Sequence, residues 1–207
     1  MNRHQHSGAP PVPRRARDRS EILDAAARVF RRRGYGAATV EDIAGELGIG
    51  KGSLYHYIRS KQELLYEIAV EPLRAANRAI DEACGLDAPV EECIRQAIVS
   101  HLEVIHEQYP RLSISLLERL ELPPEQLREI KGLHNSYQQK WTDLIARGVA
   151  DGLLRAEIDL GLTTLGILGM LNWATQWYRP EGRVSPAEIG SEFATLALRG
   201  LLADASG

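Results

Sequence analysis

The sequence predicts an all-α protein of about nine helices, with a short helix-turn-helix domain at the N-terminus and a larger helical domain behind it. Three observations predict this fold class. Apolar residues recur at the three- and four-residue spacing of helices in every long segment, and no segment alternates as a strand does. Glycines, prolines and N-cap residues stand where one periodic segment ends and the next begins. The 207 residues, 44% hydrophobic and 26% charged, are enough to bury a core.

The first two helices have clear faces and ends. The first finishes in a run of arginines before Gly34, and its apolar face consists of Ile22, Ala25, Ala26, Val29 and Phe30. The second begins at Thr39, which forms a capping box with Asp42, and its apolar positions are Val40, Ile43, Ala44 and Leu47. Gly48 ends this helix because glycine adopts positive φ at little cost.

The third helix is too short to stand alone, so we expect it to bury Leu54 and Ile58 against its neighbours. Ser60 and Glu63 then form a capping box that opens a long fourth helix, Lys61–Cys84. Prolines, acids and short turns separate the remaining expected helices, which are Pro89–Gln108, Pro110–Leu120, Pro124–Gly152, Asp159–Arg179 and Pro186–Ala203.

The charge is unevenly distributed along the chain. Residues 1–61 hold 12 Lys and Arg against six acids, whereas the remainder holds 13 against 22. A basic N-terminal quarter on an acidic body indicates an anionic partner for that quarter. Chance clustering of surface arginines is the alternative.

Several function classes are not expected from the composition. The only cysteines, Cys84 and Cys93, cannot build a disulfide framework or a Cys-rich zinc site, and reduced thiols in a cytoplasmic protein are the simplest interpretation. Leu160–Tyr178 has no charged residue over 19 positions, but its threonines, amides and three glycines favour a buried interface helix over a membrane span. His101 and His106 do not share a helical face, so we expect no metal site. No nucleophile–base pair or phosphate-cradling loop is present, so we expect neither an enzyme nor a cofactor.

Thr39–Ile58 packs two helices, joined by Gly-Ile-Gly, into 20 residues, which is the size of a helix-turn-helix. The outer face of its second helix suits DNA. Gly52 and Ser53 leave room for a close approach to the groove wall, and Lys51 offers a charge to phosphates or a donor to guanine. Tyr55 and His56 carry donors on stiff rings; for Tyr55, core packing is the less favoured alternative. Core packing and DNA contact are equally good interpretations of Tyr57, and Lys61 lies at a helix N-terminus that favours phosphate.

The stretch "TVEDIAGELGIGKGSLYHYIRSKQEL" resembles the DNA-binding segment of TetR-type transcriptional repressors, over about Ser20–Leu65. This resemblance implies a homodimer with one helix-turn-helix per subunit and a larger ligand-binding domain. It implies DNA contacts by Thr39, Lys51, Ser53, Tyr55, His56, Tyr57 and Lys61. The sequence departs from the family pattern at Gly50, where serine is common, and at Ile58, where phenylalanine is usual.

The C-terminal stretch "LNWATQWYRPEGRVSPAEIG" is similar to the penultimate-helix ending of TetR members that respond to acyl-CoA thioesters or related lipophilic metabolites. The expected function is therefore a repressor that binds a palindromic operator as a homodimer and is released by such a molecule. A drug-like or aromatic effector, or a DNA-binding protein without effector, are the alternatives. We assign residues 1–15 to a disordered lead-in, 16–62 to the DNA-binding domain and 63–207 to the ligand-binding and dimerisation domain.

Two further sets of residues follow from helical spacing in the C-terminal domain. A stripe on the last helix could form a four-helix seam with Leu160–Tyr178 across a twofold axis, or pack within one chain; it consists of Ile189, Phe193, Leu196, Ala197, Gly200 and Leu201. Rings and a methionine inside a bundle could line a ligand pocket, or serve as plain core; these are Leu117, Tyr137, Trp141, Met170, Trp173 and Trp177. Because Leu160–Tyr178 contains no cation, a fully buried CoA phosphate is not expected there.

Overall fold

The computed structural model of the chain describes residues 18–112 and 121–203. These residues form eight α-helices, labelled α1–α5 and α7–α9, and no named β-strand, so the all-α prediction is confirmed. Residues 109–112 are helical, as expected for the start of the segment Pro110–Leu120. The rest of that segment and the expected lead-in, residues 1–15, lie outside the described residues.

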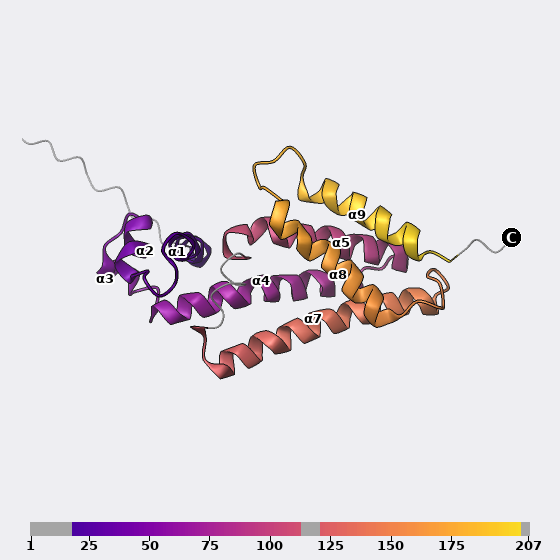
Figure 1. Ribbon diagram of the computed structural model, residues 1–207, viewed down its shortest axis with the longest axis horizontal. Coiled ribbons are helices and arrows are strands. Elements are labelled where there is room, and N and C mark those ends of the chain that lie inside the picture. Colours follow the sequence, from indigo (N-terminus) through magenta and orange to yellow (C-terminus); the bar gives the residue numbers. More distant parts are fainter. Residues whose placement is uncertain (1–17, 113–120, 204–207) are drawn as a thin grey trace, which may run out of the picture.

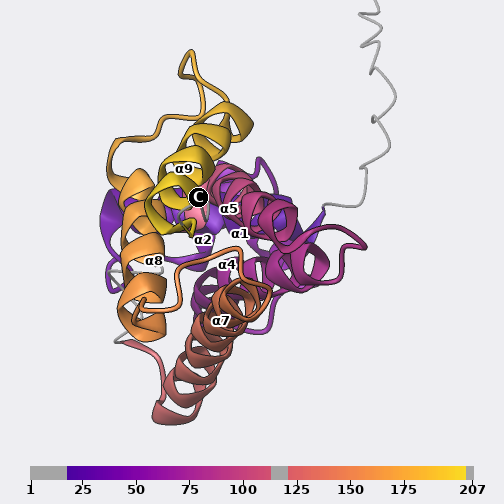
Figure 2. The same ribbon diagram turned by 90° about the vertical axis from the view of Figure 1, so that its right-hand side faces the viewer.

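Three short helices lie together at one end of the molecule, and a long helix runs from them into a bundle (Figure 1). The three are α1 (Arg19–Arg33), α2 (Val40–Glu46) and α3 (Lys51–Leu54), and the long helix is α4 (Lys61–Cys84). The bundle is completed by α5 (Val90–Glu107), α7 (Pro124–Ala150), α8 (Leu160–Trp177) and α9 (Pro186–Leu201). Figure 2 shows α9 above α8 on one flank of the bundle, with α7 at its lower edge.

The buried apolar residues form two clusters, and α4 contributes to both. The first cluster joins α1–α3 to the part of α4 that ends at Val70, with Leu122 and Ile130 from the start of α7. The second cluster begins on α4 at Ala76 and includes α5, α7, α8 and α9. Pro72 is buried between these two stretches of α4. The two parts of the chain are therefore joined by a continuous helix.

Helices α5 and α9 approach each other closely because α9 presents a glycine to α5. A Cβ atom added at Gly190 would lie 2.8 Å from the Cα atom of Val99, which only a glycine avoids. The inward face of α9 continues with Ile189, Ala194 and Leu198, all of them buried. This face binds α9 to its own chain.

In the part of the chain that the structure describes, no helix is long and apolar enough to cross a membrane. This finding includes α8, although its sequence contains no charged residue, as a membrane-spanning helix often does not.

Candidate nucleic-acid interface and ligand cavity

The start of α2 and the turn that follows this helix are formed by the residues that the sequence predicts. The Oγ1 of Thr39 accepts from the backbone N–H of Asp42 at 3.1 Å, and the Asp42 carboxylate accepts from the backbone N–H of Thr39 at 3.0 Å. This confirms the capping box at the start of α2. Gly48 adopts φ +65°, which allows the chain to reverse direction before α3.

Helix α3 ends at Leu54, and residues 55–57 form the turn that follows it. Helix and turn together have a buried back and an exposed side, which we call the front of α3. Leu54 is fully buried and Ile58 is 3% exposed, so both hold α3 onto the first cluster. The rings on the other side are open to solvent, with Tyr55 47% exposed and Tyr57 38% exposed. Lys51, Gly52 and His56 are also exposed, and Ser53 is half-buried. The front of α3 thus presents small, polar and aromatic side chains to solvent.

The charge of Lys51 lies next to this aromatic front. Its ammonium forms an ion pair with Glu41 and lies 6.0 Å from the centre of the Tyr55 ring. The hydrogen bond to Glu41 raises the pKa of Lys51, so the side chain stays protonated. Because the pair is exposed, Lys51 can exchange Glu41 for another anion at little cost.

Lys61 has a role that its sequence position does not reveal. Its Nζ atom donates to the backbone carbonyls of Tyr35 at 2.7 Å and Ala38 at 2.8 Å, and it lies 4.3 Å from the centre of the Tyr35 ring. The ammonium therefore binds the turn between α1 and α2. This geometry does not favour the predicted direct contact of Lys61 with phosphate.

Much of the basic charge of α1 holds α2 in place. Arg28 and Arg32 both donate to Glu46, at 2.9 and 2.6 Å, and Arg33 pairs with Asp42 at 2.9 Å. The hydrogen bonds from Arg32 and Arg28 lower the pKa of Glu46 to about 2. Part of the excess positive charge of the N-terminal quarter is therefore paired with acids of the same domain. The charge of this quarter is thus weaker evidence for DNA binding than the sequence alone suggests.

Arg111 is a functional candidate that sequence reasoning missed. It is 3% exposed, and its Nε atom donates to Asp24 of α1 at 2.8 Å while another N–H reaches the Ser20 carbonyl at 3.1 Å. Its neighbour Leu112 lines the cavity described next. An arginine near the start of a helical segment gives no sequence signal of burial. Arg111 therefore connects the wall of the cavity to the first helix of the N-terminal domain.

A cavity of about 620 Å³ lies between α4, α5, α7 and α8. Its inner wall is apolar, and its outer wall carries exposed side chains such as His134, Gln138 and Trp173. No described residue that lines it is an aspartate, glutamate, lysine or arginine. The size and apolar lining are typical of sites for small organic ligands.

His101 and Tyr137 form a buried polar pair in the wall of this cavity. The Nδ1 of His101 lies 2.6 Å from the Tyr137 hydroxyl, and the two rings stack with centroids 5.9 Å apart. Burial lowers the pKa of His101 to about 4, with a smaller opposite effect from Asn172. Burial also raises the pKa of Tyr137. Both groups are therefore neutral near pH 7.

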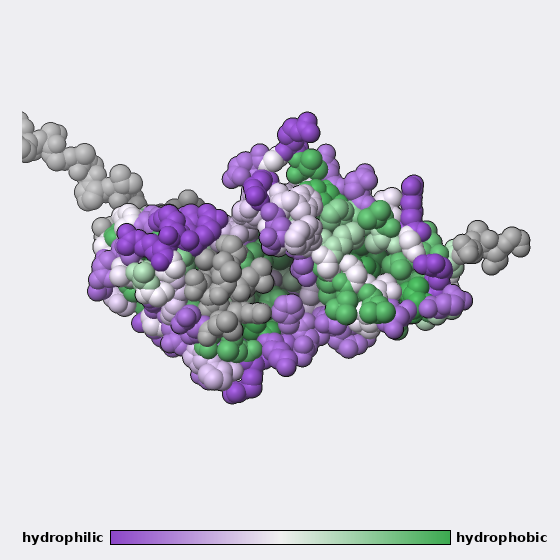
Figure 3. All heavy atoms as spheres, in the orientation of Figure 1, coloured by the Kyte–Doolittle hydropathy of each residue, from purple (hydrophilic) through white to green (hydrophobic). Residues whose placement is uncertain are grey.

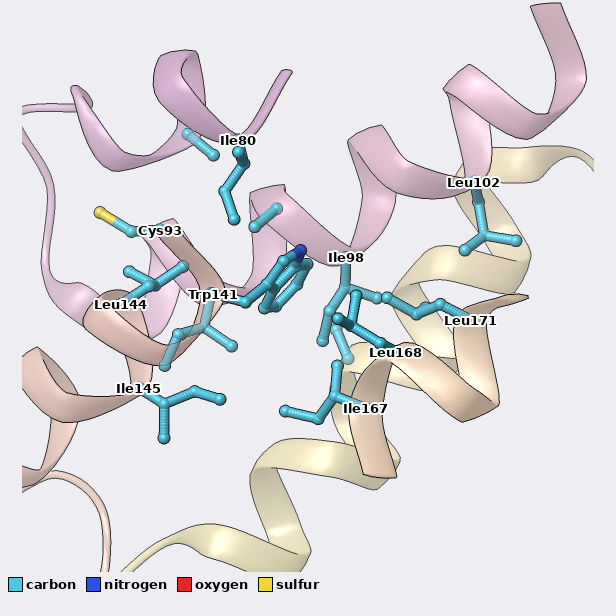
Figure 4. Close-up of a cluster of buried hydrophobic side chains, with 14 of the residues drawn as sticks. Ile80, Cys93, Ile98, Leu102, Trp141, Leu144, Ile145, Ile167, Leu168 and Leu171 are labelled. Carbon is cyan, nitrogen blue, oxygen red and sulfur yellow. The ribbon is translucent and has the colours of Figure 1, made fainter. Parts of the chain in front are cut away.

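Not all of the six predicted ligand residues line the cavity. Tyr137 and Trp173 line the cavity. The prediction for Trp141 is wrong, because this ring is fully buried in the second cluster (Figure 4) and does not line the cavity. It contacts the Tyr137 ring edge-to-face. Met170 packs against the same cluster, and Trp177 lies edge-to-face on Phe193 of α9; neither lines the cavity. Leu117 lies outside the described residues.

The predicted dimer stripe on α9 is divided between core and surface. Ile189 is packed into the second cluster and 8% exposed, so the prediction that it contacts a partner is wrong. Phe193, Ala197 and Leu201 are half-buried, and Leu196 and Gly200 are exposed. Apolar side chains also remain exposed along α8, and Figure 3 shows hydrophobic surface over this flank; the most exposed are Leu162, Leu165 and Trp173.

Two family models match the chain, and together they cover most of it. Residues 22–68 match the model of bacterial regulatory proteins of the tetR family. Residues 87–201 match the tetracyclin repressor-like C-terminal domain.

Individual relatives match over nearly their whole length. The HTH-type transcriptional repressor KstR2 of Mycolicibacterium smegmatis is 30% identical over 195 residues, which is 93% of this chain and 95% of the relative. The solved structure of the TetR family regulator PfmR from Thermus thermophilus is 34% identical, with a TM-score of 0.79 over 88% of this chain and 98% of that one. The structure of the ketosteroid transcriptional regulator KstR2 of Mycobacterium tuberculosis is 26% identical, with a TM-score of 0.78 over 92% and 98%.

Proposed function

The chain belongs to the TetR family of bacterial transcriptional regulators, and we propose that it is a cytoplasmic repressor that binds a palindromic operator as a homodimer and is released by a lipophilic small molecule. The observation that carries the DNA-binding part is the two-sided α3. Leu54 and Ile58 fix its back on the domain, and its front is open to a major groove.

The proposed DNA contacts follow from the exposure of the front of α3. Lys51 and His56 supply a charge and donors, Tyr55 and Tyr57 supply hydroxyls on rigid rings, and Gly52 leaves space for the phosphate backbone. Ser53 of α3, which is half-buried, and Thr39, the exposed N-cap of α2, add hydroxyls. Lys61 supports the contacts indirectly, through the turn between α1 and α2.

Homodimerisation through α8 and α9 is part of the proposal. Both helices carry exposed apolar side chains, such as Leu162 on α8 and Leu196 on α9, and exposed glycines on these helices let a second helix pair approach. A twofold axis there would present two copies of α3. Two copies about 34–36 Å apart would read successive turns of the major groove.

The experiment is selection of bound duplexes from a random-sequence DNA library, followed by fluorescence anisotropy with the selected sequence. We expect enrichment of a palindrome and weaker binding by Tyr55→Phe and His56→Ala, each by about five- to tenfold, because each loses one polar contact to DNA. Tyr109→Phe, which changes a hydroxyl away from α3, is the matched control and keeps parental affinity.

Selection without enrichment of any sequence would refute the operator-binding part of the proposal. In that case, binding that weakens steeply with salt and ignores sequence would indicate a general DNA-binding protein.

The effector part of the proposal is supported by the apolar cavity. The described lining residues carry no charge, which favours a lipophilic molecule, such as the acyl part of a thioester whose nucleotide remains near solvent. Residues of α4, which connects the two clusters, form part of the wall. A ligand that prefers one arrangement of α4 would change operator affinity, and about 1–3 kcal/mol of coupling changes it by about five- to 150-fold.

A further inference from the structure

The His101–Tyr137 pair leaves one hydrogen-bonding atom without a partner. His101 is 6% exposed, and its Nε2 atom is buried without a hydrogen-bond partner among the described residues. Nδ1 already bonds to the Tyr137 hydroxyl. Buried polar atoms are nearly always bonded in proteins, so a vacant one beside a cavity calls for an explanation.

The hydrogen bond between the two rings determines what the vacant atom can do. If the Tyr137 hydroxyl donates to Nδ1, the neutral imidazole carries its proton on Nε2 and only that N–H lacks a partner. If Nδ1 donated instead, both the hydroxyl proton and the Nε2 lone pair would lack partners. The first arrangement leaves fewer unsatisfied groups, so Nε2 is an N–H donor.

The residues around this donor restrict the kind of ligand group that can accept its hydrogen bond. Asn172, on the opposite helix α8, also lines the cavity and brings its side-chain amide, which carries an NH2 donor and an oxygen acceptor, close to His101. None of the described lining residues is charged, so a carboxylate or phosphate in this place would be buried without a counter-ion. An uncharged oxygen acceptor on an apolar skeleton satisfies the donors without that cost.

We infer that the cavity recognises its ligand through an uncharged carbonyl oxygen, as in a ketone or thioester, which accepts hydrogen bonds from His101 Nε2–H and from the Asn172 amide. Tyr137 is a positioning residue, because it fixes the imidazole with its proton toward the ligand. The inference rests on the proposed role of the cavity as the effector site and specifies the chemical class of effector.

The test measures ligand binding without DNA, by displacement of the uncharged fluorescent probe N-phenyl-1-naphthylamine from the full-length protein. The competitors are 2-decanone and decanoate at pH 7.5, which share a ten-carbon skeleton and differ in charge at the polar end. We expect 2-decanone to displace the probe at a concentration about tenfold or more below that of decanoate.

Four variants distinguish recognition of the carbonyl from simple packing. His101→Leu and Asn172→Leu each raise the dissociation constant of 2-decanone by about tenfold, while the affinity for the fluorescent probe stays the same. His101→Gln, which keeps an N–H donor, stays within about threefold of the parent. Gln139→Leu, which changes an exposed polar residue of α7 that does not line the cavity, is the control and leaves the ketone affinity unchanged.

The inference is overturned if His101→Leu binds 2-decanone as tightly as the parent, if decanoate competes equally well, or if the probe does not enter the parent cavity. Asn172 is exposed at the outer wall, so Asn172→Leu keeps the test decisive should His101→Leu fail to fold. Because the assay contains no DNA, its failure leaves operator binding untouched. Conversely, a ketone that binds as expected but does not release the operator would refute the proposed effector role alone.

Discussion

At the scale of single residues, the two lysines that flank the front of α3 look equivalent in the sequence and differ in the structure. Lys51 is exposed beside Tyr55, whereas Lys61 has its ammonium on backbone carbonyls of the turn between α1 and α2. The sequence predicts a DNA contact for both, Lys51 through its charge and Lys61 through its place at a helix N-terminus. The difference arises from the path of a turn more than 20 residues earlier, which spacing within a helix cannot reveal.

We predict that Lys61→Met lowers the free energy of unfolding by about 1–2 kcal/mol, because the carbonyls of Tyr35 and Ala38 lose their charged donor. Lys51→Met, the matched control with an exposed ion pair, leaves the free energy of unfolding unchanged within the error of the measurement. Urea denaturation followed by circular dichroism gives both values. Equal stabilities of the two variants would show that the carbonyl contacts of Lys61 contribute nothing.

We predict a loss of stability in mild acid that depends on His101. The unfolded chain protonates this histidine below pH 6.5, whereas the folded protein does so only near pH 4. The unfolded state therefore binds more protons between these values, and the free energy of unfolding falls as the pH drops through this window, by up to about 3 kcal/mol.

His101→Gln lacks this titration, so its stability falls less than that of the parent between pH 7 and pH 4.5. Denaturation curves at a series of pH values measure the difference. Parallel curves for the two proteins would contradict the depressed pKa of His101. A histidine among the periodic apolar positions of α5 is a signal that sequence reasoning could have used, although only the structure brings it to Tyr137.

At the scale of elements, helix positions follow from the sequence because the causes are local. The cap at Thr39, the positive φ at Gly48 and the buried pair Leu54 and Ile58 were all predictable from spacing and residue type. The expected box at Ser60 is only half formed, since Glu63 N–H donates to the Ser60 hydroxyl while its carboxylate accepts from Arg59 N–H. Which face of α9 is buried was less predictable, because the close approach of Gly190 to α5 depends on a partner about 90 residues away.

The contact between Arg111 and α1 supports a prediction about how the two parts of the chain are held. Arg111→Met leaves the Asp24 carboxylate without its donor, and we expect a loss of about 2–4 kcal/mol in the free energy of unfolding. Adding Asp24→Asn to this variant recovers part of the loss, because no unpaired carboxylate remains.

The control for this pair is Arg74→Met, which breaks an exposed ion pair with Glu129 and costs less than about 0.5 kcal/mol. Thermal or urea denaturation of the four proteins tests the prediction. A double variant that is no more stable than Arg111→Met would show that Arg111 acts by packing alone.

At the scale of the whole molecule, the proposed dimer surface gives a prediction for assembly. Leu162→Glu and Leu196→Glu place carboxylates on the exposed apolar surface of α8 and α9, where a second copy would bury them. We expect each to raise the dimer dissociation constant by about 100-fold or more, and to weaken operator binding in parallel.

Sedimentation velocity at micromolar concentration measures this effect. Leu86→Glu changes an exposed leucine in the turn between α4 and α5 and is the matched control, which stays dimeric. If the α8 and α9 variants also stay dimeric, the interface lies elsewhere on the molecule.

Pro72 has a mechanical consequence for the complete repressor. It removes a backbone donor from α4 between the two clusters, so bending there breaks one hydrogen bond fewer than elsewhere. About 11 residues of helix, roughly 16 Å at 1.5 Å each, separate this point from Lys61. A tilt of about 10° at Pro72 therefore displaces the N-terminal domain by about 3 Å, and two subunits tilting in opposite senses alter their separation by about 6 Å. That is close to two base pairs along a duplex, enough to put the second subunit out of step with its half-site.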